Sequence, residues 1–208
     1  MSEPTTFADS VETPLPRLLH WTLQDDRISF RADAYGLVTP DGVVLIDPLP
    51  LSDAALDAVG PVKSICLTEG QHQRSAWRYR RRFGVPVHAP HGAHELEEGP
   101  DHWFGDGDAL PGDLRSMDTP GFGTVHCAFV AERGPGGRVL FSGDLVVCLE
   151  DGGAFALIPD KYVDDPEAIR ASVARLLNLA PDVLCPAHGA PVVGGAGAAL
   201  EQALQVRT

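Results

Sequence analysis

Four polar segments follow predicted strands directly, and they contain most of the residues that could do chemistry. The segments are residues 67–74, 118–122, 140–144 and 184–189. In open α/β sheets, ligands bind beyond the carboxyl ends of the strands, so we expect these segments to meet at one edge of the protein. They include the carboxylates Glu69 and Asp144 and the imidazoles His72 and His188. Such groups bind a first-row metal ion or transfer protons during hydrolysis.

The elements that must position these segments can be predicted from the pattern of apolar residues. Residues 34–48 contain two β-rich runs around Pro40-Asp41-Gly42, which is typical of a hairpin. Residues 61–88 show a strand, a helix and a strand, which favours parallel pairing. The other predicted elements are turn-separated strands between residues 105 and 150, helices over 165–179 and 197–206, and a strand over 183–185. Together they predict an α/β sandwich of two mixed sheets with helices outside.

Charge and composition exclude several classes of partner. The sequence has 16 Lys and Arg against 29 Asp and Glu, a formal net charge of −13, which repels nucleic acid and anionic membranes. It contains no apolar run of the ~20 residues that a membrane helix needs, and its start does not resemble a signal peptide. The four cysteines are widely spaced, which is typical of reduced, buried thiols. We therefore expect a cytoplasmic protein, with residues 1–14 as a loose lead-in and residues 15–208 as one domain.

Five short runs occur along the chain in a defined order. They are residues 41–47 (Asp-Gly-Val-Val-Leu-Ile-Asp), Leu67-Thr68, Thr119-Pro120-Gly121, residues 141–144 (Phe-Ser-Gly-Asp) and residues 186–189 (Pro-Ala-His-Gly). In order and spacing the chain resembles the metallo-β-lactamase superfamily over roughly residues 33–193. The resemblance implies a four-layer αβ/βα sandwich of two mixed β-sheets, with a metal site at one edge. It also implies a hydrolase of thioesters, lactams, lactones or phosphoesters.

Most metal ligands of that family are replaced in this chain. The family motif His-x-His-x-Asp-His, after a Leu-Thr strand end, falls on Glu69, Gln71, Gln73 and Arg74. The next ligand position is Phe122, whereas the last Asp and His of the family match Asp144 and His188. Glutamine is a weak ligand, phenylalanine is none, and a guanidinium stays positively charged. The resemblance therefore implies that the ordinary dinuclear centre is lost.

Asp144 still needs a partner, because burying an unpaired carboxylate is costly. We hypothesise that Arg74 forms a bidentate pair with Asp144 and occupies the space of the missing metals. Phe122, Gln71 and Gln73 would then line the cleft as substrate-binding residues. On this interpretation the protein needs no cofactor.

Two functions remain open. The first is a hydrolase-like protein without a metal centre, a pseudoenzyme that binds or regulates through a small-molecule ligand. The second is an active hydrolase of a thioester, lactone or similar ester. It would hold one Zn, Fe or Mn ion through Asp144, His188 and Glu69, with His72 as a further candidate ligand. Alternatively, His188 and Asp144 would work without metal, with Arg74 as oxyanion stabiliser. The oligomeric state stays open in both.

Several of these residues have simpler interpretations as well. Asp144 could be no more than a cap at a strand end, His188 could be an ordinary turn residue, and His72 could lie on the surface. His126 is expected to pack in the interior or to support the site from behind. The histidines in residues 88–94 recur every three positions, a spacing that could suggest a metal site. On a helix, however, side chains at this spacing do not stay on one face.

A serine hydrolase is a further alternative. Ser142 or Ser75 would be the nucleophile, activated by His188 and Asp144. The chain has no Gly-x-Ser-x-Gly motif, so no sequence feature positions such a nucleophile.

Overall fold

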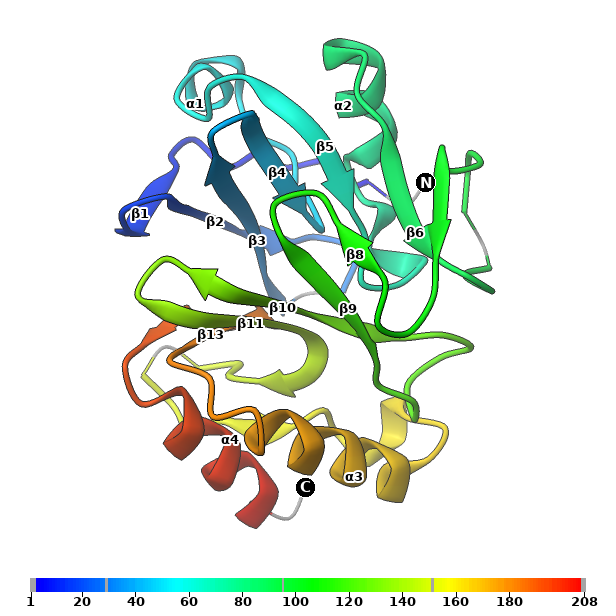
Figure 1. Cartoon of the computed structure of the whole chain (residues 1–208), viewed down its shortest axis with the longest axis vertical. Coiled ribbons are helices and arrows are strands. Elements are labelled where there is room, and N and C mark those ends of the chain that lie inside the picture. The colour runs from blue at the N-terminus through cyan, green and yellow to red at the C-terminus, as the bar shows by residue number, and fades with distance from the viewer. Residues whose placement is uncertain (1–2, 29, 95, 151, 207–208) are drawn as a thin grey trace.

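The computed structural model describes residues 3–28, 30–94, 96–150 and 152–206. In these residues two β-sheets pack face to face, and helices cover the outer face of each sheet (Figure 1). Both sheets combine parallel with antiparallel pairs. The predicted four-layer sandwich of two mixed sheets is therefore confirmed.

The first sheet has the strand order β1-β2-β3-β4-β5-β6-β7. Its strands are β1 (Glu12–Leu15), β2 (Leu18–Asp25), β3 (Phe30–Thr39), β4 (Gly42–Ile46), β5 (Val62–Cys66), β6 (Val87–Pro90) and β7 (His102–Phe104). Strands β1 to β4 pair antiparallel, and β4 to β7 pair parallel. The predicted hairpin is β3–β4, and the predicted strand–helix–strand unit joins the parallel neighbours β5 and β6.

The second sheet has the order β14-β13-β11-β10-β9-β8, with β12 paired to β11. Its strands are β8 (Ala109–Leu110), β9 (Leu114–Asp118), β10 (Cys127–Gly134), β11 (Gly137–Val147), β12 (Ala156–Leu157), β13 (Val183–His188) and β14 (Val192–Val193). Strands β11 and β13 are parallel neighbours, so their carboxyl ends lie at the same edge of the sheet. The residues that end these two strands are therefore brought together.

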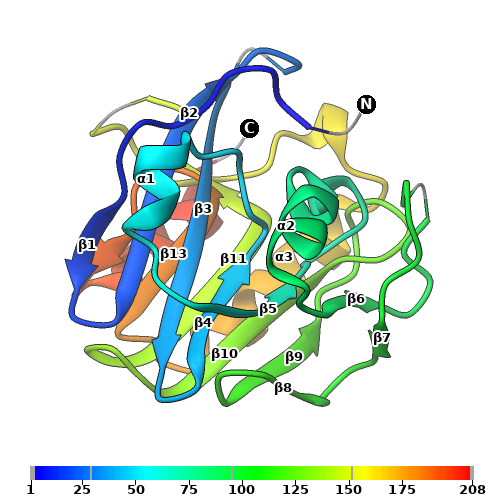
Figure 2. The ribbon, with the colours of Figure 1, turned by 90° about the horizontal axis from the view of Figure 1, so that it is seen from above.

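Two pairs of helices form the outer layers. The α-helices are α1 (Asp53–Asp57), α2 (Ala76–Phe83), α3 (Pro166–Leu177) and α4 (Ala196–Gln205), and short 3₁₀ turns are η1 (Gln71–Gln73) and η2 (Asp160–Tyr162). Figure 2 shows α1 and α2 in front of the first sheet, with α3 behind both sheets. The side chain of Ser52 caps α1 and that of Asp165 caps α3, because each accepts a hydrogen bond from a backbone N–H of the first turn. No helix in the described residues is long and apolar enough to cross a membrane.

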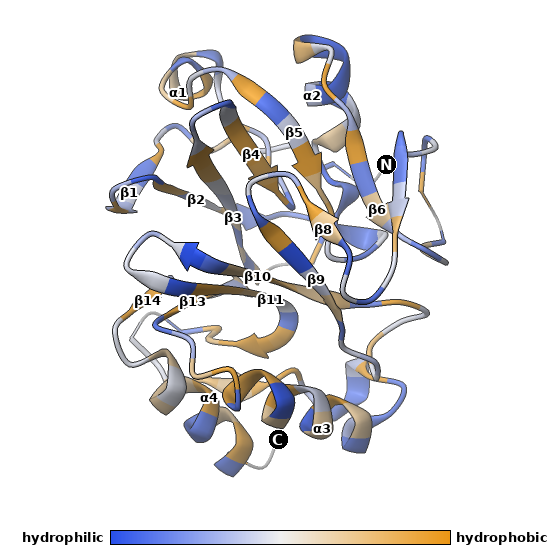
Figure 3. Cartoon of the chain, viewed as in Figure 1, coloured by the Kyte–Doolittle hydropathy of each residue, from blue (hydrophilic) through white to orange (hydrophobic). Residues whose placement is uncertain are grey.

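The main core lies between the two sheets. Large side chains there include Tyr35, Ile46, Phe104, Phe129 and Phe141, and all five are at most 3% exposed. Figure 3 shows apolar residues along the central strands, whereas the helices alternate apolar with polar residues. Strand β11 is buried on both faces from residue 139 to residue 147, because the first sheet covers one face and the helices cover the other.

Part of the predicted lead-in, residues 1–14, contacts the rest of the fold. The N–H of Ala8 donates to the carbonyl of Pro50 (2.9 Å), and the carbonyl of Ala8 accepts from the N–H of Ser52 (3.0 Å). Ala8 is also 6% exposed, and Val11 packs against the same core cluster. These apolar contacts and backbone hydrogen bonds tie the segment around Ala8 to the residues just before α1.

Candidate functional site

The polar segments after β5 and β9 meet those within the second halves of β11 and β13 at one edge of the sandwich, as expected. Gly143 pairs with Pro186, which places Asp144 beside the end of β13. The N–H of Cys127 donates to the carbonyl of Thr68 (3.0 Å), so the start of β10 in the second sheet joins the end of β5 in the first. The two sheets therefore close against each other at this edge, where the polar side chains collect.

His72 lies at the centre of this group, and it is only 4% exposed. Its Nδ1 is 3.0 Å from Oδ2 of Asp47 and 2.9 Å from Oγ1 of Thr68. Its Nε2 is 3.2 Å from Oε1 of Glu69 and 3.2 Å from Oδ1 of Asp144. The interpretation of His72 as a surface residue is therefore wrong. The turn η1 directs the ring inward, between carboxylates from both sheets.

Asp47 holds His72 from behind. It follows β4 with φ of +46°, a left-handed conformation that turns its side chain toward the end of β5. Its Oδ1 accepts the N–H of Thr68 (2.8 Å), and its Oδ2 accepts the hydroxyl of Thr68 (2.7 Å). These bonds fix the carboxylate, and the carboxylate in turn fixes the imidazole of His72 with Nε2 toward the site.

His188 is held in a similar way by different partners. Its Nδ1 lies 2.5 Å from the backbone carbonyl oxygen of Arg31, and its Nε2 lies 3.4 Å from Oδ1 of Asp144. The next residue, Gly189, donates its N–H to Oδ2 of Asp33 (2.7 Å), which is fully buried. Residues at the start of β3 in the first sheet thus position a histidine of the second sheet. As predicted, Asp144 and His188 lie together.

Two carboxylate oxygens of the cluster are buried without a hydrogen bond. Oε1 of Glu69 and Oδ1 of Asp144 have no hydrogen-bond partner among the described residues, although Nε2 of His72 lies close to both. Leaving such an acceptor unsatisfied costs about 1–3 kcal/mol, and more when it is charged. One ligand atom each from His72, Asp144 and His188 also lies within 4.8 Å of the other two. The arrangement can accept a cation between these atoms.

Burial and the neighbouring charges shift the pKa values of Asp144, Glu69 and His72 strongly. Burial alone would raise the pKa of Asp144, but the charges of His72 and His188 hold that pKa well below its usual range. Burial raises the pKa of Glu69 to about 8, since the attraction of His72 opposes it only in part. Burial and the charge of Arg74 would lower the pKa of His72, but the surrounding carboxylates raise it to about 10. In the metal-free protein a proton on His72 therefore balances the carboxylates.

His126 supports Asp144 from behind, as predicted. Its Nε2 accepts the backbone N–H of Asp144 (3.2 Å), so its proton is on Nδ1, which lies 2.7 Å from Oγ1 of Thr119. Burial lowers the pKa of His126 to about 4, which keeps the ring neutral and able to accept that bond. Gly143 makes this approach possible, because a Cβ there would lie 2.4 Å from Nε2 of His126.

Arg74 does not form the expected pair with Asp144. Its Nη1 donates to the backbone carbonyl oxygens of Asp33 (3.1 Å) and Asp47 (3.2 Å), and no ion pair joins it to Asp144 in the described part of the chain. Arg74 has φ of +30°, which turns it away from the direction of η1 and toward β3 and β4. Nε2 of His72 (3.2 Å) and Nε2 of His188 (3.4 Å) approach Oδ1 of Asp144 instead. The guanidinium still lowers the pKa of Asp144 through space.

The serine-hydrolase alternative finds no support in the contacts of either serine. The hydroxyl of Ser75 donates to Oε1 of Glu3 (2.5 Å) and not to a histidine. The hydroxyl of Ser142 is buried and has no hydrogen-bond partner among the described residues. His188 therefore activates neither hydroxyl in this arrangement.

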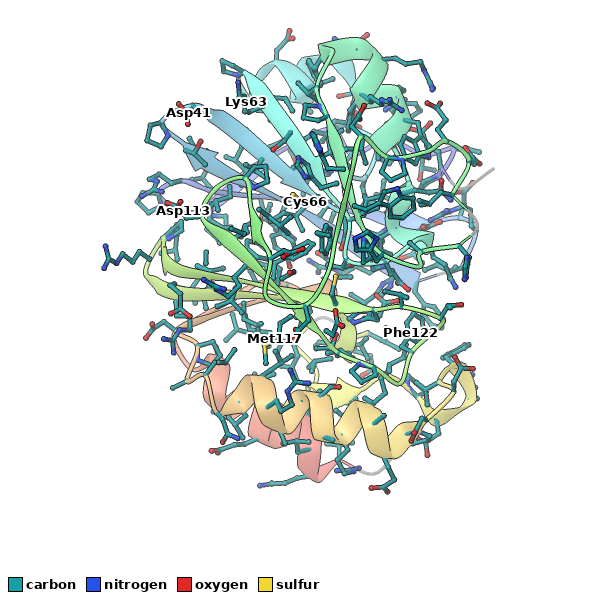
Figure 4. The ribbon with its side chains drawn as sticks, turned by 45° about the vertical axis from the view of Figure 1, so that its right-hand side comes forward. Asp41, Lys63, Cys66, Asp113, Met117 and Phe122 are labelled. Carbon is teal, nitrogen blue, oxygen red and sulfur yellow. The ribbon has the colours of Figure 1, made fainter. Side chains whose placement is uncertain are left out.

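A cavity of about 550 Å³ opens beside the cluster. Asp144, His188 and two of the predicted substrate-binding residues, Gln71 and Phe122, line it. Figure 4 shows Phe122 at this edge of the molecule, whereas Asp41 and Asp113 lie at the opposite edge. The third such residue, Gln73, is buried elsewhere. Its Oε1 accepts the indole N–H of Trp77 (2.6 Å) and the N–H of Glu97 (2.7 Å), so it anchors α2 rather than the cleft.

The chain matches a known protein family. A family model described as the metallo-beta-lactamase superfamily matches residues 11–185. The chain belongs to the metallo-β-lactamase superfamily. No match was found among curated proteins.

Solved structures of this superfamily share the fold over nearly the whole chain. The metallo-β-lactamase from Pontibacter korlensis is 19% identical, with a TM-score of 0.72, and the match covers 95% of this chain and 99% of that one. The metallo-β-lactamase FIM-1 from Pseudomonas aeruginosa in its mono-zinc form is 11% identical, with a TM-score of 0.74 and coverage of 99% and 96%. The superfamily protein ST1585 from Sulfolobus tokodaii is 16% identical, with a TM-score of 0.67 and coverage of 98% and 85%. At such identities the likeness establishes the fold alone.

Sequence reasoning on this superfamily member missed the groups that orient its histidines. Asp47 ends one of the recognised runs but had no assigned role, and its contact with His72 spans 25 positions. The backbone carbonyl of Arg31 and the carboxylate of Asp33 hold the segment of His188 across more than 150 positions. Of these groups, only Asp47 gave a sequence signal, because it is a polar residue at the end of a predicted strand. A backbone carbonyl gives none, because every residue has one.

Proposed function

We propose that Glu69, His72, Asp144 and His188 hold a single metal ion, and that the protein is a hydrolase of esters, thioesters or lactones. The observation that supports this most directly is the pair of buried oxygens on Glu69 and Asp144 without hydrogen bonds. A cation is the partner that both could share, because carboxylate oxygens and imidazole nitrogens are ligands for Zn²⁺.

The distances among His72, Asp144 and His188 fit this assignment, since one ligand atom of each lies within 4.8 Å of the other two. Glu69 joins them through its contact with Nε2 of His72. Adjacent ligand atoms of the cluster are separated by 3.2, 3.2 and 3.4 Å. Around a tetrahedral zinc ion with bonds of about 2.0–2.1 Å, the ligand atoms would be roughly 3.3 Å apart. The Nδ1 atoms of both histidines also contact oxygen atoms, of Asp47 and Arg31, which is how metal-binding imidazoles are usually oriented.

The chemistry follows from these residues and the adjoining cleft. When bound, the ion would supply Lewis acidity and an activated water for hydrolysis. The chain's own part is to orient the two imidazoles, to keep Asp144 ionised, and to hold an acyl substrate in the apolar cavity beside them. One ion is proposed because Gln73 and Phe122, at two of the family's other ligand positions, offer no suitable group to the cluster. The mono-zinc form of FIM-1 supports the use of one ion on this fold.

A metal-free binding protein is the second candidate, and one observation favours it. The carboxylates around His72 raise its pKa to about 10, so a protonated ring balances much of their charge without a metal. In that case the protein is a pseudoenzyme whose cleft binds a small molecule. Its partner would still be small, since the acidic surface repels nucleic acid.

Metal analysis separates the two candidates. Protein purified without chelator is expected to contain one equivalent of metal or to bind one equivalent of added Zn²⁺ in a calorimetric titration. Asp144→Asn should lose that binding, together with hydrolysis of p-nitrophenyl acetate and phenyl thioacetate. Asp118→Asn, at the exposed carboxylate that ends β9, should keep both. Failure of the wild type to bind Zn²⁺, Fe²⁺ or Mn²⁺ would establish the metal-free alternative.

The compartment is also a proposal. All four cysteines are free and buried, although the chain contains enough of them for two disulfides. Free thiols in this number are typical of a reducing compartment, which supports the cytoplasm.

A further inference from the structure

We propose that the cleft beside the cluster takes a neutral substrate with an apolar arm, and rejects anionic substrates of the same length. The proposal rests on the hydrolytic function proposed above and names its substrate class. The arm would be held by a set of exposed side chains that we call the apolar rim. The apolar rim consists of Ile28, Phe30, Leu149 and Tyr162.

The apolar rim is unusual for its exposure. Its side chains are between 36% and 48% exposed, and each lines the cavity. Among the described residues, the other large hydrophobic side chains with comparable exposure are Phe7, Trp103 and Val193. In the part of the chain that the structure describes, more than half of the exposed large hydrophobic residues are therefore gathered at one opening. Covering them with a ligand would remove apolar surface from water, which favours binding by roughly 25 cal/mol per Å².

The apolar surface continues from the rim to the reacting end of the cleft. Phe122, Val147 and Ile158 also line the cavity, and each is at most 8% exposed. Asp144 and His188 lie in the same lining. A substrate whose carbonyl reaches the cluster would therefore extend along apolar walls toward the rim. A cavity of about 550 Å³ is within the usual range for small-molecule sites.

The charges around the cleft oppose an anion. Asp144 and Asp164 line the cavity, and no lysine or arginine is among its described lining residues. Lys161 lies beside the rim, but its Nζ is 4.7 Å from the ring centroid of Tyr162, over the aromatic face. The whole chain has a formal charge of −13. A substrate with a carboxylate at its far end would meet no dedicated partner there, whereas a methyl group would meet the apolar rim.

A matched pair of amides tests this preference without any hydrolysis. Octanamide and 8-amino-8-oxooctanoate have the same length and the same amide, but one ends in a methyl group and the other in a carboxylate. Calorimetric titration of the full chain is expected to give at least about tenfold tighter binding of octanamide, equivalent to 1.4 kcal/mol. Equal or tighter binding of the carboxylate, or no binding of octanamide, would overturn the proposal.

Substitutions in the rim locate the binding. Ile28→Ser and Leu149→Ser should each weaken octanamide binding about three- to tenfold. Because both residues are more than 40% exposed, neither change should lower the melting temperature appreciably. Val193→Ser is the matched control, since Val193 is 47% exposed and lies outside the cleft. Equal effects of all three substitutions would contradict the assignment to the rim.

The outcomes distinguish this inference from the proposed function. If octanamide binds with the stated preference but no ester is hydrolysed, the substrate pocket stands and the hydrolase proposal fails. If p-nitrophenyl acetate is hydrolysed but the two amides bind equally, the hydrolase stands and the preference for an apolar arm fails. Lys161→Gln should leave both affinities unchanged. A loss of 8-amino-8-oxooctanoate binding in this variant would instead reveal an anion subsite, against the proposal.

Discussion

Nδ1 of His72 lies 3.0 Å from Oδ2 of Asp47, and this contact decides which nitrogen of His72 faces the site. Asp47 belongs to the end of β4 and His72 to the turn after β5, so the pairing of these parallel strands creates the contact. The result is an imidazole whose Nε2 is presented to the carboxylates of Glu69 and Asp144.

Replacing Asp47 should weaken metal binding without touching a proposed ligand. In Asp47→Asn the side chain no longer provides a charged acceptor for Nδ1 of His72. Removal of such an orienting partner typically costs 10–100-fold in metal affinity. Competition between the protein and a chromophoric chelator for Zn²⁺ measures the change. Asp41→Asn, at the exposed turn before β4, is the control and should bind as the wild type does. Unchanged affinity in Asp47→Asn would refute this role.

Asp33 should be a main source of stability at the contact between the sheets. It is fully buried, accepts the N–H of Gly189 (2.7 Å), and pairs with His20 (2.7 Å) and Arg31 (2.8 Å). Asp33→Ala would leave these partners without their common acceptor, and should cost about 3–5 kcal/mol in the free energy of unfolding. Urea denaturation measures this loss.

Tyr35→Phe is the comparison for the stability lost in Asp33→Ala, because Tyr35 also bonds across the contact between the sheets. It removes only the hydroxyl that donates to the carbonyl of Pro186 (2.8 Å), and should cost about 1 kcal/mol. If the two variants lost equal stability, the assigned importance of the Asp33 network would be wrong.

Gly143→Ala should disturb both stability and the site. Gly143 has φ of +55°, and an added Cβ would lie 2.4 Å from Nε2 of His126. The left-handed conformation costs roughly 1–2 kcal/mol and the overlap about 1–3 kcal/mol more. Displacement of His126 would also free the backbone N–H of Asp144 and lower metal affinity.

Gly152→Ala is the matched control for that substitution. Gly152 has φ of +72°, and nothing lies within 4 Å of its added Cβ. Only the backbone cost of roughly 1–2 kcal/mol is expected, with unchanged metal affinity. Guanidinium denaturation and Zn²⁺ titration of both variants check these values. Equal losses would mean that the contact with His126 is unimportant.

His88 should make the fold less stable in acid. Burial, together with the charge of His102, whose ring stacks on it at 4.7 Å, lowers the pKa of His88 to about 4, although Asp101 opposes the shift. Because the folded pKa lies below the unfolded value of about 6.5, the unfolded chain takes up the proton first as the pH falls. His88 should therefore have no effect above pH 6.5, and should reduce stability progressively from pH 6.5 to pH 4.

His88→Gln tests this pH dependence. Between pH 7 and pH 4, the free energy of unfolding of the variant should fall by about 1–2 kcal/mol less than that of the wild type. This value allows for the partial exposure of His88. Chemical denaturation at several pH values measures the difference. Parallel stability curves for the two proteins would show that His88 does not titrate in this window.

The arrangement of the sheets could be predicted from the sequence because it depends on local patterns. The β3–β4 hairpin follows from two apolar runs around Pro40-Asp41-Gly42, and the parallel pairing of β5 and β6 follows from the helix between them. The proximity of Asp144 and His188 was also predictable. Each stands at or near the carboxyl end of its strand, and such ends share an edge when the strands run parallel.

The orientation of side chains within the turn after β5 could not be predicted in this way. In a 3₁₀ turn each residue is rotated by about 120° from the one before, so a change of one position decides which side chain enters the site. Here His72 faces inward, Gln73 bonds to Trp77, and Arg74 turns to backbone carbonyls of β3 and β4.

The sequence by itself therefore determined the sandwich and the edge at which polar groups gather. The tertiary structure alone decided that His72, rather than Arg74, neutralises Asp144. The physical reason is that this choice depends on acceptors brought from distant strands, the carboxylate of Asp47 for His72 and the carbonyl oxygens of Asp33 and Asp47 for Arg74. No pattern within residues 67–74 contains those partners.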